Sequence, residues 1–117
     1  MPIADPDRQT EIADQLTDHA RALATSTRQF PRRSDTYRLL GDLSATVSAL
    51  EQVCSQLGAF HAGAQAGVDY DGEDADGNGQ SAREAATSLA GAHEALTAAG
   101  AAIDRAHTAN SHLRWTS

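Results

Sequence analysis

Residues 39–61 read LLGDLSATVSALEQVCSQLGAFH, and their spacing sets the architecture of the chain. Apolar side chains recur alternately three and four residues apart over three heptads, which is the repeat of a coiled-coil seam. The seam positions are Leu40, Leu43, Val47, Leu50, Cys54, Leu57, His61 and Ala64. Leu39, Val53 and Phe60 each lie one position before a seam residue and widen the stripe. The pattern predicts a central helix over about 35–66 that contacts two neighbouring helices.

A second long helix is predicted over about 81–113. Ser81 followed by Glu84 is the pattern of a capping box at a helix start. The heptad spacing then continues at Ala82, Ala85, Leu89, Ala92, Leu96, Ala99, Ile103, Ala106, Asn110 and Leu113. Alanine at alternate positions lets two backbones approach closely, so we expect a tight antiparallel pair with the central helix.

A shorter helix is predicted over about 7–27, where Ile12, Leu16 and Leu23 form one narrow apolar stripe with His19 or Ala20 and Thr27. Asp5 can cap it and Pro6 suits its first turn. The expected fold is therefore all-α, a long antiparallel helical hairpin plus a shorter N-terminal helix in one domain, 1–117. Such a three-helix bundle would use coiled-coil-like packing.

The three helices differ in length, since about 32 residues span roughly 50 Å and about 20 span roughly 30 Å. The first helix can therefore cover only part of the hairpin. The residues expected in the uncovered third are Val53, Leu57, Phe60, Ala85 and Leu89. An open apolar face of this kind favours a homodimer, which would complete a four-helix arrangement.

Composition narrows the class of protein. The 117 residues fit one domain, and the single cysteine, Cys54, excludes an intramolecular disulfide. No stretch approaches the roughly 20 apolar residues that cross a bilayer, and the first residues are acidic where a signal peptide would be basic and then apolar. We therefore expect a cytoplasmic protein that does not contact a membrane.

The net charge of −7 is concentrated in one segment, 68–79, which holds five acidic residues and no basic one. Its richness in glycine and acid predicts a flexible loop. Asp74, Asp76, Asn78 and Gly79 occupy the first, third, fifth and sixth places of a loop that resembles the calcium loop of the EF-hand family. Ala85 stands at the twelfth place, where that loop needs a glutamate. Asp74, Asp76 and Asn78 are thus a weak candidate metal site, and the sequence predicts no cofactor.

The opposite end of the expected hairpin gathers arginines and aromatic residues from distant parts of the sequence. These residue types dominate binding energy at many protein interfaces. We call the set the arginine–aromatic pole and expect it to bind a partner: Arg28, Phe30, Arg32, Arg33, Tyr37, Arg38, Arg114 and Trp115. The alternative is that its aromatic rings pack the end of the bundle and its arginines are solvated.

No arrangement of reactive residues predicts an enzyme. Asp104 and His107 are the nearest approach to a helical metal motif, but di-metal sites need two such motifs and further carboxylates. Cys54 lies in the middle of a seam, away from any activating group. The sequence therefore predicts a non-catalytic helical protein–protein interaction or assembly protein that forms a homodimer. The alternatives are a helical protein that binds nucleic acid through the arginine–aromatic pole and an acidic inhibitor-type protein.

Overall fold

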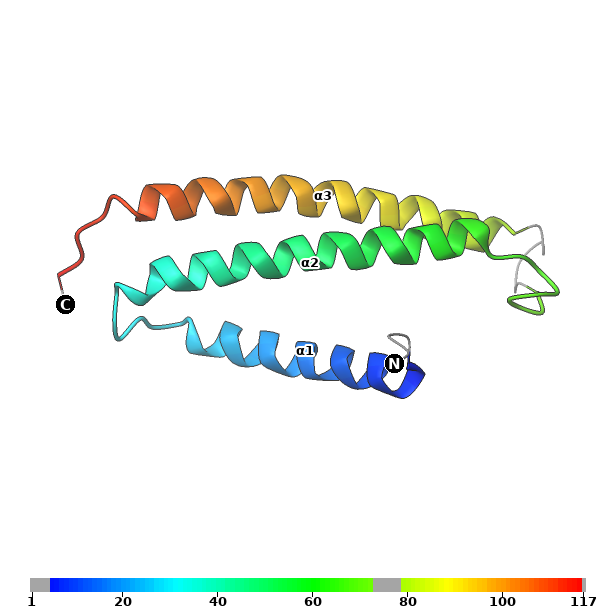
Figure 1. Ribbon diagram of the computed structural model, residues 1–117, viewed down its shortest axis with the longest axis horizontal. Coiled ribbons are helices and arrows are strands. Elements are labelled where there is room, and N and C mark those ends of the chain that lie inside the picture. Colours follow the sequence, from blue (N-terminus) through cyan, green and yellow to red (C-terminus); the bar gives the residue numbers. More distant parts are fainter. Residues whose placement is uncertain (1–4, 73–78, 117) are drawn as a thin grey trace. The chain divides into compact units, whose positions relative to one another are not determined.

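The computed structural model describes residues 5–72 and 79–116, and three α-helices contain most of them (Figure 1). Helix α1 spans Pro6–Ser26, α2 spans Asp35–Gly63 and α3 spans Gln80–Asn110. Within the described ranges there is no β-strand, and a single bridge joins Ala66 to Tyr70. The predicted all-α class, with two long helices and a shorter N-terminal one, is confirmed.

The chain separates into two compact units, one ending at Arg33 and the other comprising Ser34–Thr116. The first unit contains α1, and the second contains the hairpin of α2 and α3. The single domain predicted for residues 1–117 stays a prediction.

Helix α1 begins as the sequence predicts. The carboxylate of Asp5 accepts hydrogen bonds from the backbone N–H groups of Asp7 and Arg8, at 2.9 and 3.2 Å. These groups have no partner within the helix, so a capping carboxylate stabilises its first turn. Pro6, which has no N–H to leave unpaired, is the first helical residue.

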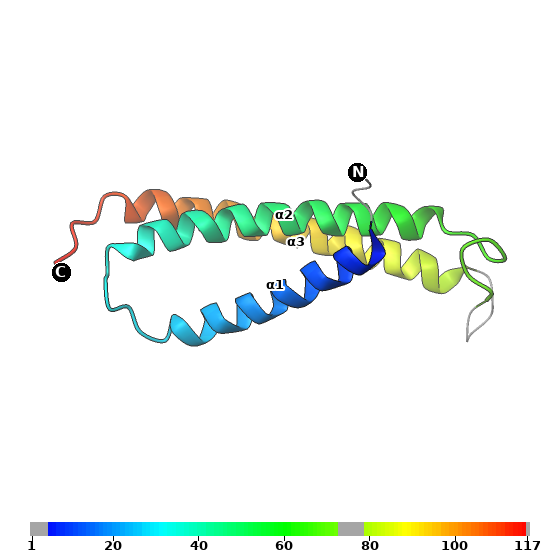
Figure 2. The same ribbon diagram turned by 60° about the horizontal axis from the view of Figure 1, so that its bottom comes forward.

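Helices α2 and α3 run antiparallel and lie side by side along most of their lengths (Figures 1 and 2). The register is fixed by three hydrogen bonds between side chains. The Asn110 amide donates to Thr36 Oγ1 at 3.0 Å, Ser44 Oγ donates to Asp104, and Thr97 Oγ1 donates to Glu51 Oε2 at 3.1 Å. The tight antiparallel pair expected from the heptad spacing is therefore present.

The seam between α2 and α3 contains small and polar residues as well as apolar ones. On α2 the buried or half-buried positions facing this seam repeat four and three residues apart at Leu40, Ser44, Val47, Glu51, Cys54, Gly58 and His61. A Cβ placed on Gly58 would lie 3.5 Å from Leu89 Cβ, and one placed on Gly100 would lie 3.6 Å from Val47 Cγ1. Small residues thus allow the two backbones to approach closely. Among the described residues only Val47, 8% exposed, is buried.

The predicted seam differs from the observed one by one residue at several positions. Leu43 and Leu57 were expected in it, yet both are exposed, and Ser44 and Gly58 lie at the seam instead. On α3, Ala99 and Ala106 are exposed, while Gly100 and His107 are half-buried. The reason is that α2 carries two overlapping heptad repeats one residue apart, and α3 packs against the one with smaller and more polar residues.

The ends of α2 and α3 also differ from expectation. Helix α2 ends at Gly63 rather than near residue 66, and α3 ends at Asn110 rather than near 113. Ser81 does not cap α3, because the cap residue is Gly79, whose φ of 74° lies in the left-handed region that favours glycine.

After α2 the chain forms a hydrogen-bonded turn. The backbone N–H of Gln65 donates to the Asp69 carboxylate at 2.8 Å, and that of Gly67 donates to the Tyr70 carbonyl at 2.6 Å. The first part of the loop predicted to be flexible over 68–79 therefore belongs to a defined turn. Residues 73–78, including the weak metal candidates Asp74, Asp76 and Asn78, lie outside the described residues.

Candidate functional site

The second heptad repeat of α2 lies beside the seam, about 100° around the helix from it, and forms an apolar surface that we call the outer stripe. Its members are Leu39, Leu43, Leu50, Val53, Leu57 and Phe60. Leu39 and Leu50 are half-buried, whereas Leu43, Val53, Leu57 and Phe60 are 39%, 46%, 45% and 61% exposed. Contiguous exposed apolar side chains on one face of a helix are typical of a surface that another protein covers.

From Leu43 onward the outer stripe lies on a part of α2 that carries almost no charge, whereas Asp35, Arg38 and Asp42 precede Leu43. Between Leu43 and Gly67 the one Asp, Glu, Lys or Arg is Glu51, and it is half-buried where it accepts the hydrogen bond from Thr97. The remaining side chains around the stripe are alanine, serine, threonine, glutamine or glycine. A solvated helix normally has charged residues on its outer face, so the composition of α2 favours contact with another helix.

The predicted oligomer face is only partly assembled on this surface. Val53, Leu57 and Phe60 belong to the outer stripe and are exposed. Ala85 and Leu89 are half-buried on α3, and Leu89 lies against Gly58 in the seam. The outer stripe extends instead toward the start of α2 through Leu50, Leu43 and Leu39.

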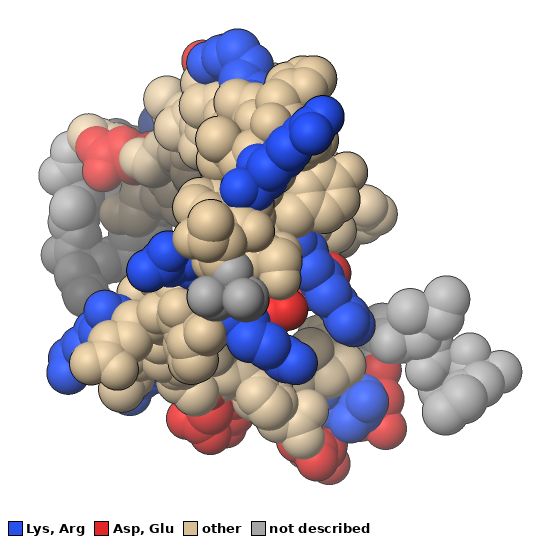
Figure 3. Space-filling view, turned by 90° about the vertical axis from the view of Figure 1, so that its left-hand side faces the viewer, with Lys and Arg blue, Asp and Glu red and all other residues tan. Residues whose placement is uncertain are grey.

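The arginine–aromatic pole is divided between the two units. Arg28, Phe30, Arg32 and Arg33 belong to the unit of α1, whereas Tyr37, Arg38, Arg114 and Trp115 belong to the hairpin. Figure 3 views the hairpin from the end at which α2 begins and α3 ends, and arginine side chains are exposed there. Trp115 follows the end of α3 and is 41% exposed.

Tyr37 of the pole has a partner within the hairpin. Its ring stacks on that of His107 with the centroids 4.2 Å apart and the planes 30° apart. His107 is half-buried in this stacked arrangement. Tyr37 therefore helps to join the two helices, although it is still 45% exposed and lies at the same end as Arg38, Arg114 and Trp115. Binding of a protein or a nucleic acid at the pole stays a prediction.

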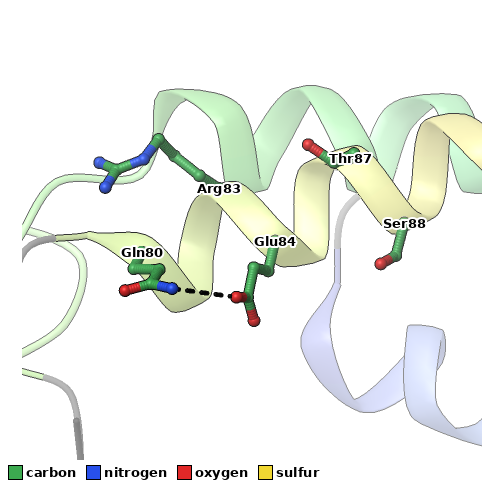
Figure 4. Close-up of a pocket in the computed structure, with 5 residues that line it drawn as sticks. All are labelled: Gln80, Arg83, Glu84, Thr87 and Ser88. Carbon is green, nitrogen blue, oxygen red and sulfur yellow. Dashed lines mark hydrogen bonds between the residues drawn. The ribbon is translucent and has the colours of Figure 1, made fainter.

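A shallow hollow lies along the first turns of α3 (Figure 4). The residues that line it all come from one face of that helix and are all exposed: Gln80, Arg83, Glu84, Thr87 and Ser88. The Gln80 amide donates to the Glu84 carboxylate at 3.2 Å, one helical turn away. The hollow lacks opposing walls from a second element, so we do not assign a ligand to it.

The residues considered for chemistry are engaged in the hairpin. Asp104 accepts the hydrogen bond from Ser44, His107 stacks on Tyr37, and the ring of His61 donates to the Leu57 carbonyl at 2.7 Å. Over residues 5–72 and 79–116, no three histidine, cysteine, aspartate or glutamate side chains are grouped so that they could hold a metal ion. None of the helices in those ranges is long and apolar enough to cross a membrane.

One signal for the outer stripe is already visible in the sequence. From Leu43 to Gly67 the one Asp, Glu, Lys or Arg is Glu51, which distinguishes α2 from α1, whereas α3 has a similar stretch over 85–103 with Glu94 alone. Apolar spacing alone could not separate the outer stripe from the seam, because the two repeats have the same period and are offset by one residue.

No known protein family, no curated protein and no solved structure matches this chain.

Proposed function

We propose that this chain is a non-catalytic helical assembly protein that binds a helical partner, in the first place a second copy of itself, through the outer stripe of α2. The observation that carries the proposal is the exposure of Leu43, Val53, Leu57 and Phe60 on the nearly uncharged part of α2, from Leu43 to its end. Full burial of such a side chain contributes about 1.5–3 kcal/mol. Because these side chains are about half exposed, each still offers roughly 1 kcal/mol to association.

The small number of buried side chains supports the same proposal. A chain of this length normally buries a core of several side chains, yet among the described residues only Val47 is buried. Association through the outer stripe would bury the apolar residues that the hairpin leaves exposed.

The proposal is tested by light scattering coupled to size-exclusion chromatography at several protein concentrations. We expect a particle of about twice the chain mass of 12.3 kDa. Association through apolar side chains should persist in 1 M salt, where interactions between exposed charges are screened. A mass equal to one chain at all concentrations would refute self-assembly.

A matched pair of variants locates the surface. Leu57→Glu places a charge in the outer stripe and should give a monomer, because an unpaired buried carboxylate is strongly unfavourable. Gln52→Glu adds the same charge to an exposed position of α2 outside the stripe and should leave the mass unchanged. If Leu57→Glu associates as the unchanged chain does, another surface is responsible. Circular dichroism of both variants confirms that the helices remain formed.

A further inference from the structure

We draw no further inference here: the strongest candidate, the exposed apolar surface that the outer stripe forms on α2, belongs to the site already described, and nothing in the described part of the chain shows what covers it or in which direction.

Discussion

At the scale of single residues, polar contacts inside the seam determine the register in which α2 and α3 pair. Thr36 with Asn110, Ser44 with Asp104, and Glu51 with Thr97 are three hydrogen-bonded pairs spaced along α2. A slip of one residue would break all three pairs and leave half-buried polar groups without partners. Such pairs add little net stability, but they discriminate against other registers.

We expect Thr36→Val to destabilise the hairpin by about 1–3 kcal/mol, the usual cost of leaving a buried polar group unpaired. The substitution removes the acceptor of the Asn110 amide, whose oxygen Oδ1 is already buried without a hydrogen bond. Urea unfolding followed by circular dichroism at one fixed protein concentration measures the change.

The double variant Thr36→Val with Asn110→Leu is the control for this prediction. It replaces both polar partners by apolar side chains and should recover most of the loss. Equal destabilisation by the single and the double variant would show that the hydrogen bond is not the cause.

At the scale of elements, glycines of α2 and α3 differ in their surroundings. Nothing lies within 4 Å of a Cβ placed on Gly91, whereas one placed on Gly41 of α2 would lie 3.3 Å from His107 Nε2. Gly41 thus leaves room for the ring that stacks on Tyr37. Gly91 has no such role in the hairpin.

Gly91→Ala should stabilise the hairpin by about 1 kcal/mol, because alanine is the better helix former by that amount. Gly41→Ala should gain less, or lose stability, since the added methyl group would displace the His107 ring. Thermal unfolding of the two variants side by side tests the contrast. An equal gain in both would mean that the ring moves aside at no cost.

Because α2 carries two heptad repeats, the ends of the helices are easier to predict than the face of α2 that packs on α3. Helix α2 was expected over 35–66 and spans Asp35–Gly63, and the cap at Asp5 is where the sequence places it. Start and stop signals act locally, so they can be read from the sequence. The choice between Leu43 and Ser44 as the seam residue depends on which face α3 covers.

At the scale of the whole molecule, both ends of the hairpin carry charges of both signs. Asp35, Arg38, Asp42 and Arg114 lie toward one end, and Asp69, Asp71, Arg83 and Glu84 lie toward the other. The part of α2 between them carries the outer stripe, which contributes most of the affinity in the proposed self-assembly.

The sequence by itself determined the all-α class, the three helices and the cap at Asp5, because helical periodicity and capping depend on residues close together in the chain. The sequence also showed that α2 has almost no charged residues from Leu43 to its end. The tertiary structure decided that α3 packs on Ser44, Glu51 and Gly58, and thereby left Leu43 and Leu57 exposed. Two apolar repeats on one helix are equivalent until a neighbour packs on one of them, and that choice depends on small residues and polar partners supplied by the distant helix.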